Sequence, residues 1–142
     1  MDTDLDKIHA LIDQYGWAAQ QKDPESMLRL YGEQVRIFDL WDQASVRGLA
    51  EWALIVRHWL GNLGTETVHV EFEQTEVIVE GDLAVVTAFV HYQARDAAGA
   101  VLRKMKNRLT WSLARRGPDW RIVHQHTSIP IDSQKIAPKF NA

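Results

Sequence analysis

The sequence predicts an α+β domain in which about three N-terminal helices pack against a strongly curved, mostly antiparallel β-sheet to form a cone. Two observations carry this prediction. Apolar residues recur at helical spacing through much of residues 4–63, and they alternate with polar residues from Thr67 onward. Helices followed by strands are typical of helices gathered on one face of an antiparallel sheet. The 142 residues, 46% of them hydrophobic, suit one domain spanning 1–142.

The first two helices are predicted from their start signals. Thr3 can cap a helix whose first turn carries two aspartates, which suit the positive end of the helix dipole. Its apolar stripe comprises Leu5, Ile8, Ile12, Tyr15 and Ala19. A second, short helix is expected after Asp23, with Pro24 at its first position and Gly32 at its C-terminal cap. Its apolar side comprises Met27, Leu28, Leu30 and Tyr31.

A strand and a third helix are expected next. Residues 35–41 predict a strand, and side chains at every second position share a face. That face carries Val35, Ile37, Asp39 and Trp41. Gly48 precedes the third helix, which ends at Gly61 and Gly64. Its apolar stripe comprises Leu49, Trp52, Ala53, Val56, Trp59, Leu60 and Leu63.

The remaining chain predicts a meander of four long strands. The first begins at Thr67, and its apolar phase shifts near Gln74–Thr75, which indicates a bulge or a bend. The other three are expected at Leu83–Arg95, Val101–Arg115 and Trp120–Ile129. Gly-containing turns separate them. Residues 132–142 are expected to form a loosely held C-terminal tail.

Composition excludes several classes of protein. The absence of cysteine excludes disulfides, thiolate zinc sites and a cysteine nucleophile. The net charge of −3, with no basic block, argues against binding to nucleic acid. No apolar run is long enough to span a membrane, and the N-terminal sequence does not have the pattern of a signal peptide. A cytoplasmic protein is therefore expected. The six tryptophans predict a large core, a lined cavity or a buried interface.

The end of the chain resembles a known family. The segment Trp120–Pro130 is similar to the closing strand of SnoaL-like proteins in the nuclear transport factor 2-like superfamily. It also resembles the last strand of the association domain of calcium/calmodulin-dependent kinase II. Arg108 with Thr110, and Arg47-Gly48, fit the same pattern. The resemblance implies a cone-shaped α+β barrel, a fold that hosts isomerases, cyclases, hydrolases, dehydratases and non-catalytic assembly domains.

Tyr15 and Asp39 resemble a pair of residues in ketosteroid isomerase, the enzyme that also serves as a standard example of pKa tuning. The segment between them aligns with that family without a gap. The resemblance implies that Tyr15 donates to a substrate carbonyl oxygen and that Asp39 moves the proton. The family has a second acid at the oxygen, and Asn107 or a neighbour stands there in this chain. Asparagine can donate a hydrogen bond but cannot be a protonated acid.

Asp39 and Tyr15 each have two interpretations. Asp39 shares an apolar strand face, where burial would raise the pKa of its carboxyl and make it a suitable general base. Alternatively, it is a solvated acid at the end of a strand, or an acid paired with Arg36, Arg47 or Arg108. Tyr15 lies on the apolar stripe of the first helix. It is either a core tyrosine or a donor whose hydroxyl points into the cavity near Asp39.

Two further groups leave alternatives open. His124 and His126 project from one strand face together with Trp120 and Ile122, as a proton-transfer or substrate-binding pair, as metal ligands or as structural residues. No third ligand marks a metal site. Arg108 and Asn107 lie on opposite faces, so only one of them can face the cavity. The family pattern favours Arg108, which could bind an anionic group, whereas the alternation favours Asn107.

These observations predict a small-molecule enzyme with an apolar pocket. It would perform cofactor-independent, metal-independent acid/base chemistry on a carbonyl-type or cyclic substrate, as an isomerase, cyclase or dehydratase does. The expected catalytic residues are Asp39, Tyr15 and His126. The expected ligand-binding residues are Trp41, Trp59, Phe89, Asn107, Arg108 and His124.

The alternative is a non-catalytic ligand-binding or oligomerisation module like the kinase association domain, which needs neither Asp39 nor Tyr15. A homodimer is expected under both interpretations, because the long strands are apolar on both faces. Val86, Ala88 and Val90 lie on one face, and Val85 and Phe89 lie on the other.

Overall fold

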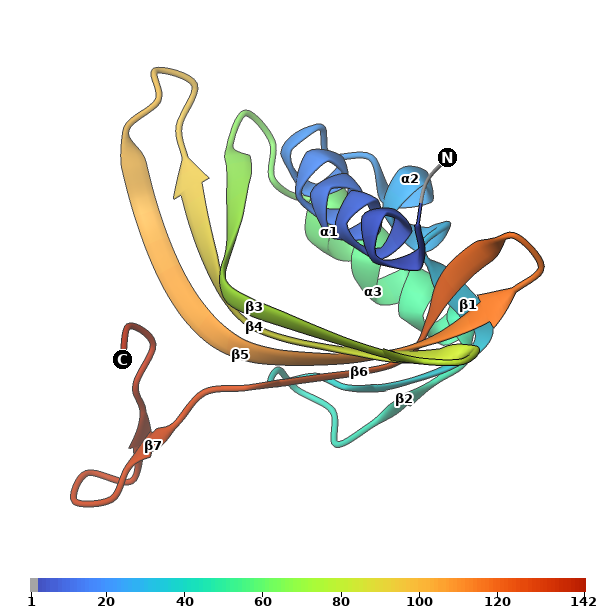
Figure 1. Ribbon diagram of the computed structural model, residues 1–142. Helices are drawn as coiled ribbons and strands as arrows, with labels where there is room; N and C mark the ends of the chain where they lie inside the picture. The colour runs from blue at the N-terminus through green and yellow to red at the C-terminus, as the bar shows by residue number, and fades with distance from the viewer. Residues whose placement is uncertain (1–2) are drawn as a thin grey trace.

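Three helices cover one face of a curved, six-stranded sheet (Figure 1). The computed structural model describes residues 3–142, so Met1 and Asp2 of the expected domain lie outside the described residues. The strands run in the spatial order β2-β1-β6-β5-β4-β3, and every neighbouring pair is antiparallel except β1 and β6. The expected cone of helices on a mostly antiparallel sheet is confirmed.

The elements follow the expected order. The helices are α1 (Asp4–Gln20), α2 (Pro24–Leu28) and α3 (Leu49–Gly61). The strands of the large sheet are β1 (Tyr31–Phe38), β2 (Val46–Arg47), β3 (Thr67–Glu80), β4 (Leu83–Arg95), β5 (Val101–Arg116) and β6 (Asp119–Ser128). A separate two-stranded ladder joins β7 (Ile131–Asp132) to β8 (Ala137–Pro138). Within residues 3–142, no helix is both long enough and apolar enough to cross a membrane.

Side-chain caps start the first two helices as predicted. At α1, the backbone N–H of Asp6 donates to Thr3 Oγ1, and the backbone N–H of Thr3 donates to Asp6 Oδ2, both at 3.1 Å. At α2, the backbone N–H of Ser26 donates to Asp23 Oδ1 at 3.1 Å. α3 begins after Gly48, whose φ of 89° suits a residue without a side chain.

The first strand begins four residues earlier than predicted. Tyr31, expected on the second helix, pairs instead with Ile122 at the start of the parallel ladder between β1 and β6. Gly32 lies inside β1 and not at a helix cap; a Cβ added there would lie 3.6 Å from the carbonyl oxygen of Ile122. The strand ends at Phe38, so Asp39 lies just beyond it. Pairing with β6, which sequence periodicity does not reveal, explains this shift.

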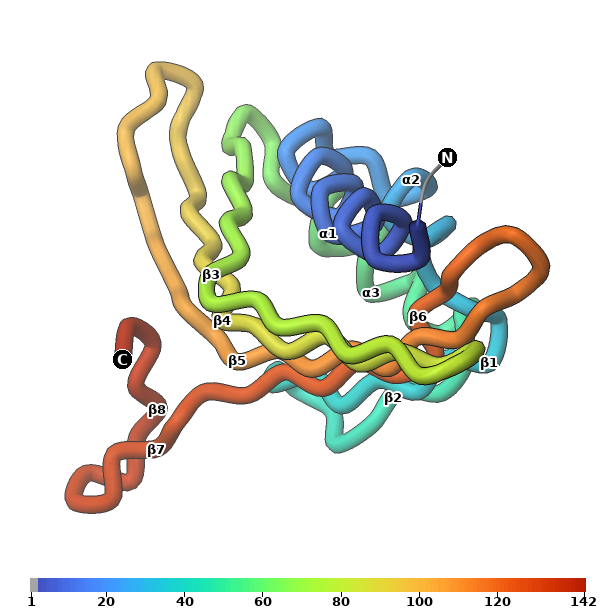
Figure 2. The backbone as a smooth tube through the Cα atoms, viewed as in Figure 1, coloured from blue at the N-terminus to red at the C-terminus, as the bar shows by residue number. Residues whose placement is uncertain are grey.

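The long strands bend over the helices. Figure 2 shows β3, β4 and β5 rising together on one side, so that the sheet is concave toward α1 and α3. The register of β3 against β4 shifts between Glu73 and Glu76, where Gln74 has a φ of 52°. The predicted irregularity near Gln74–Thr75 is confirmed, and it contributes to the curvature because a bulge increases local twist.

A second bulge in β6 was not predicted. Leu113 pairs with Ile122, whereas the adjacent Ser112 pairs with His124, so Val123 is an extra residue in β6. The alternation of side chains therefore inverts at Val123. Trp120 and Ile122 face the helices, whereas the histidines that follow the bulge face away from them. The expectation that these four side chains share one face is wrong for this reason.

The helices and the inner face of the sheet form one core. Ile8 of α1 and Val56 of α3 are fully buried, as are Val35 and Ile37 of β1. Trp111 of β5 is the largest fully buried side chain. The predicted helical stripes and the predicted inward positions of the meander thus meet in a single apolar layer.

The C-terminal tail is attached to the body of the protein, in contrast to the loose tail expected. The β7–β8 ladder turns the chain back toward β5 (Figure 2). The backbone N–H of Lys106 donates to the carbonyl oxygen of Phe140 at 2.8 Å. The ring of Phe140 stacks on Trp41 with a centroid separation of 5.9 Å. An aromatic contact and a backbone hydrogen bond, neither visible in the alternation of residues, explain the difference.

Candidate active site

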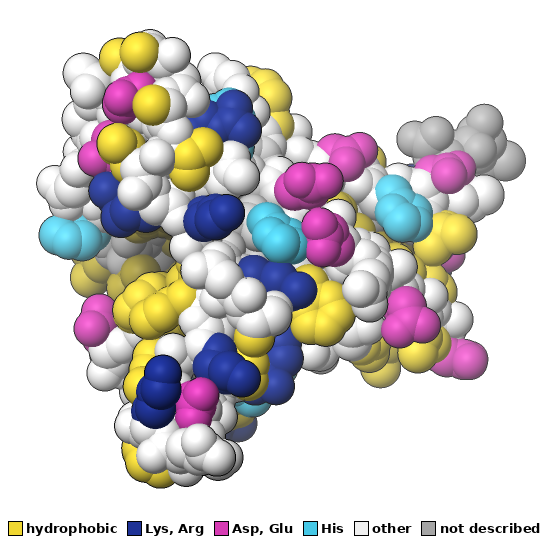
Figure 3. Space-filling view, turned by 90° about the vertical axis from the view of Figure 1, so that its left-hand side faces the viewer, with side chains coloured by type: hydrophobic (Ala, Val, Ile, Leu, Met, Phe, Trp, Pro, Cys, Tyr) yellow, Lys and Arg dark blue, Asp and Glu magenta, His cyan; other side chains and the backbone are white. Residues whose placement is uncertain are grey.

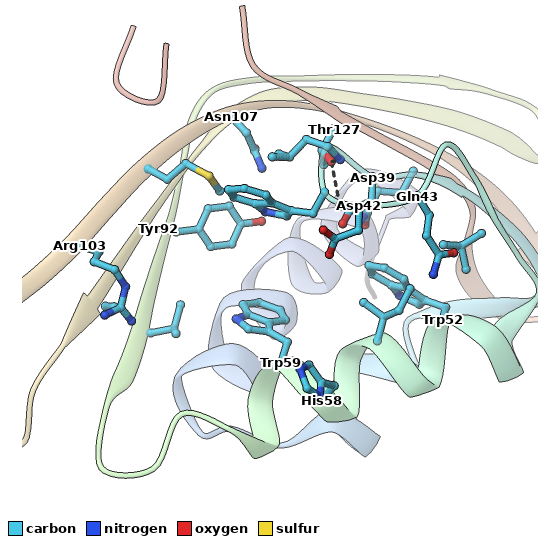
Figure 4. A pocket seen from close by; sticks show the side chains of 18 of the residues that line it. Asp39, Asp42, Gln43, Trp52, His58, Trp59, Tyr92, Arg103, Asn107 and Thr127 are labelled. Carbon is cyan, nitrogen blue, oxygen red and sulfur yellow. Dashed lines mark hydrogen bonds between the residues drawn. The ribbon is translucent and has the colours of Figure 1, made fainter. Parts of the chain in front are cut away.

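A pocket of about 650 Å³ lies between the helices and the inner face of the sheet, as Figure 4 shows. Its walls come from α1, α3, β4, β5, β6, the segment that follows β1, and the tail. Its apolar lining includes Trp41, Trp52, Ile55, Trp59, Leu63 and Met105. This volume and this apolar character are typical of sites that bind small molecules. Figure 3 shows the open end of the molecule, where hydrophobic and basic side chains border a hollow.

Asp39 brings a carboxyl group into this pocket. It is half-buried, and its Oδ1 accepts a hydrogen bond from Thr127 Oγ1 of β6 at 3.1 Å. The same hydroxyl oxygen accepts from the backbone N–H of Leu40 at 3.2 Å, which fixes the start of the loop. Burial raises the pKa of Asp39 above its usual value, and the hydrogen bond from Thr127 partly opposes this shift.

Asp39 does not pair with a cation in the described part of the chain. None of the ion pairs within residues 3–142 includes it, so the predicted alternative of an arginine partner is not met. Arg36 instead lies over the ring of Phe38, and Arg108 donates to the hydroxyl of Ser128 at 3.0 Å. Among the described residues, neither oxygen of this carboxylate is paired with a cation, so the group can accept a proton.

Tyr15 and Tyr92 form a hydroxyl pair next to this carboxyl. Their oxygens lie 3.0 Å apart, with Tyr15 on α1 and Tyr92 on β4. Burial raises the pKa of Tyr15 well above its usual value and raises the pKa of Tyr92 to about 12. The negative charge of Asp39 adds to both shifts. Both hydroxyls therefore stay protonated at neutral pH and can donate hydrogen bonds.

Tyr92 is not among the predicted site residues, although the sequence predicts that at least one of His91 and Tyr92 meets the cavity or an interface. Its position offered a signal, because it continues the inward alternation of Val86, Ala88 and Val90 on β4. Two tyrosines 77 positions apart can only be matched once the packing of α1 against the sheet is known. The pair is therefore visible in the structure alone.

Amide and hydroxyl groups complete the polar part of the pocket. Asn107 of β5 faces inward and is 3% exposed, as the alternation predicts, and Arg108 faces outward. Asn107 lies close enough to Tyr92 to lower the pKa of the tyrosine, and within residues 3–142 its Oδ1 has no hydrogen-bond partner. Gln125 is also buried, and its Oε1 accepts from Tyr31 at 2.5 Å and from Trp111 at 2.8 Å. These two donors hold Gln125 in place at the pocket wall.

Two predicted aromatic residues line the pocket. Trp59 of α3 packs its ring edge-on to Tyr92, with centroids 6.3 Å apart. Trp41 follows β1 and lies under Phe140, yet 49% of its surface is exposed. Trp52, which the sequence predicts as core and cavity wall, lines the pocket as well.

Four of the predicted site residues do not reach the pocket. Phe89 and Arg108 pair across β4 and β5 on the outer face, as their position in the alternation requires. His124 and His126 lie on the same outer face because of the bulge at Val123, and both contact Phe38 edge-on. The expected catalytic role of His126, and the expected ligand contacts of the other three, are therefore not compatible with this geometry.

The histidine pair also lacks the surroundings of a metal site. His124 Nδ1 lies 2.7 Å from the carbonyl oxygen of Arg36 and is held by the backbone. Across residues 3–142, no three His, Asp or Glu side chains lie in a group that could hold a metal ion.

Comparison with known proteins shows which family this chain belongs to and which solved structures have a similar fold. The chain matches the SnoaL-like domain over residues 8–132. No curated protein shows a significant match. An NTF2-like protein of unknown function from Pseudomonas putida is 21% identical with a TM-score of 0.82, over 95% of this chain and 92% of that one.

Two further solved structures have the same architecture. An NTF2-like protein with a cystatin-like fold from Novosphingobium aromaticivorans is 22% identical with a TM-score of 0.77, over 94% of this chain and 86% of that one. A Xanthomonas campestris protein, named after the calcium/calmodulin dependent protein kinase II association domain, is 18% identical. Its TM-score is 0.74, over 89% of this chain and 88% of that one. These likenesses establish the fold and agree with the resemblance carried by the closing strand.

Proposed function

Because the chain belongs to the SnoaL-like domain family, we propose that it is a cofactor-independent enzyme that moves a proton next to the carbonyl group of an apolar, ring-shaped substrate. One observation carries the proposal. A half-buried carboxyl that has no cation partner among residues 3–142 shares an apolar pocket with two protonated hydroxyls. A base and oxygen-stabilising donors, facing a space of about 650 Å³, are the parts that such a reaction requires.

The proposed proton transfer needs only the substrate and the groups that line the pocket. The carboxylate of Asp39 accepts the proton from the carbon beside the carbonyl. The electrons of that C–H bond form a carbon–carbon double bond, and the carbonyl electrons move onto oxygen. The resulting enolate oxygen accepts a hydrogen bond from the tyrosine pair, which stabilises the negative charge in an apolar site. In a substrate with a double bond between the β and γ carbons, the enolate charge extends to the γ carbon. The protonated Asp39 returns the proton there, the double bond moves between the α and β carbons, and the net reaction is an isomerisation.

The pKa shifts support this division of roles. A carboxylate with a raised pKa is a stronger base than an exposed one. The tyrosines, with raised pKa values, keep the protons that they donate. Cyclisation or elimination of water from a similar substrate would use the same groups, and none of these steps requires a cofactor.

Hydrogen–deuterium exchange tests the proposal. 2-Tetralone has a carbonyl, an apolar ring and exchangeable protons beside the carbonyl, and NMR in D₂O measures their loss. The wild-type protein is expected to accelerate exchange, and Asp39→Asn to lower the accelerated rate by about 10²–10⁴-fold, because it removes the general base. Asp13→Asn changes an exposed acid on α1 outside the pocket and serves as the matched control.

Stability measurements separate function from structure. If Asp39 serves catalysis, Asp39→Asn is expected to keep or raise the melting temperature, because it removes a charge that burial disfavours. Exchange at the solvent rate by the wild-type protein, or equal rates in the wild type and Asp39→Asn, would contradict the proposal. A large loss of stability in Asp39→Asn would assign the carboxyl a structural role.

A second candidate is a non-catalytic assembly module, and one observation favours it. The outer face of the sheet exposes Ile78 (61%) and Val85 (37%), which pair directly across β3 and β4. Such a surface suits a second copy of the chain, so a homodimer is proposed under either function. The Xanthomonas campestris structure named after an association domain shares this architecture. An assembly module would bind 2-tetralone weakly or not at all.

A further inference from the structure

The two tyrosines at the pocket have different surroundings. Tyr15 also borders the pocket, but it is only 3% exposed and packs edge-on against Phe72 at 5.9 Å and Trp111 at 5.5 Å. Tyr92 is half-buried on the pocket wall, and Figure 4 shows its hydroxyl pointing into the space between the sheet and α3, toward the side where Asp39 lies.

Burial determines which hydroxyl donates to the other. Within residues 3–142, Tyr92 Oη is the one acceptor within hydrogen-bond distance of the Tyr15 hydroxyl. If Tyr92 donated to Tyr15, the Tyr15 proton would have no acceptor in the core, and an unsatisfied buried donor is costly. Tyr15 therefore donates to Tyr92.

The proton of Tyr92 is then free to reach a ligand. Tyr92 Oη accepts the hydrogen bond from Tyr15 at 3.0 Å. Hydrogen bonds in a chain polarise one another, so a hydroxyl that accepts one becomes a stronger donor. Because Tyr92 borders the pocket, its O–H group can point at a substrate oxygen.

We propose that Tyr92 is the catalytic residue that donates to the substrate oxygen, and that Tyr15 is a positioning residue that acts through it. This assignment reverses the role implied for Tyr15 by its resemblance to ketosteroid isomerase. It rests on the proposed function, since it concerns the oxygen that becomes negative when Asp39 removes the proton.

Phenylalanine variants of the two tyrosines are matched to each other. Tyr92→Phe and Tyr15→Phe each remove one hydroxyl of the same hydrogen bond, so a purely structural pair would respond equally to both. We expect Tyr92→Phe to lower the exchange rate of 2-tetralone by about 10²–10³-fold, as loss of an oxyanion donor does. Tyr15→Phe leaves that donor in place and is expected to cost about tenfold or less. The double variant should match Tyr92→Phe.

A binding measurement tests the same assignment without turnover. 2-Naphthol resembles an enolate, and its absorption spectrum distinguishes the neutral form from the ionised form. Tyr92→Phe should reduce the affinity and the ionised fraction of the bound probe more than Tyr15→Phe does. Equal effects of the two variants, or a larger effect of Tyr15→Phe, would overturn the assignment.

The two proposals fail in different ways. Absence of wild-type exchange, together with naphthol binding that depends on Tyr92, would refute the reaction but retain Tyr92 as the donor. Exchange that depends on Asp39 but responds more strongly to Tyr15→Phe would retain the reaction and refute the role of Tyr92. If naphthol does not bind to the wild-type protein, the assignment of an oxygen-binding donor is refuted as well.

Discussion

Asp39 owes its chemistry to its position one residue beyond the end of β1. There it leaves the hydrogen-bonded ladder, accepts from Thr127 and remains half-buried in an apolar pocket. The sequence could indicate this residue, because an acid among apolar neighbours at alternate positions is unusual. It could not exclude an arginine partner, since the direction of each arginine depends on pairing between strands that are far apart in the chain.

The rate of hydrogen–deuterium exchange in 2-tetralone is expected to increase with pH. The ionised form of Asp39 is the base, so the rate should rise with pH through the pKa of Asp39, which lies above 3.8. It should not fall again in the neutral range, because Tyr92, with a pKa of about 12, remains protonated there. The measurement is the rate against pH after subtraction of solvent exchange. A fall in rate between pH 6 and 9 would mean that another group, absent from this mechanism, titrates.

Asp39 should also make stability depend on pH. Its pKa is higher in the folded state than in the unfolded state, so the folded protein binds this proton more tightly. The contribution of Asp39 to stability is therefore favourable at low pH and is lost as pH rises through the folded pKa. Urea denaturation should reveal this component as a pH-dependent difference between the wild type and Asp39→Asn. If the stability difference between the wild type and Asp39→Asn is the same at pH 3 and pH 7, the raised pKa of Asp39 is contradicted.

At the scale of elements, the bulge in β6 determines which side chains enter the pocket. The one extra residue at Val123 turns Gln125 and Thr127 inward and both histidines outward. The sequence could predict the strand itself, and it could predict the bulge in β3, where the apolar phase visibly shifts. In β6 the polar residues Gln125 and Thr127 occupy the inner face, so no apolar pattern marked the inversion. The incorrect placement of His124 and His126 follows from this single residue.

Gln125 is expected to contribute strongly to stability because it joins three strands. Its Oε1 accepts from Tyr31 of β1 and Trp111 of β5, and both donors are buried. Gln125→Leu would leave both donors without a partner, at a cost of about 1–3 kcal/mol each. Chemical denaturation measures the loss. The matched variant Gln20→Leu, at the exposed end of α1, should change stability by less than about 0.5 kcal/mol. Equal stability of the two variants would mean that water replaces the amide.

At the scale of the whole molecule, the sheet has two different surfaces. The inner surface packs on the helices and forms the pocket, whereas the outer surface carries apolar side chains on β3 and β4 next to basic and histidine side chains on β5 and β6. The sequence could predict that both faces of the long strands are apolar. It could not determine how much of the outer face stays uncovered, because that depends on the placement of the helices.

The outer surface is expected to hold two copies of the chain together. Light scattering at micromolar concentration should give the mass of a dimer for the wild-type protein. Val85→Asp should shift the mass to that of a monomer, because a charge opposite Ile78 would be desolvated in the interface. Leu54→Asp, at a position on α3 that is 68% exposed, is the matched control and should remain dimeric. A monomeric wild-type protein would contradict the expected dimer.

The parallel pairing of β1 with β6 has a consequence for how the chain acquires its activity. Asp39 and Thr127 are 88 positions apart, and the ladder that brings them together closes a loop containing most of the chain. Contacts of such long sequence separation are slow to form, since the entropy of closing the loop must be overcome before they stabilise anything. A nascent chain that has not yet released β6 from the ribosome cannot assemble this site. The recovery of ligand binding during refolding should therefore report the last step of folding, after the β3–β4–β5 meander has already formed.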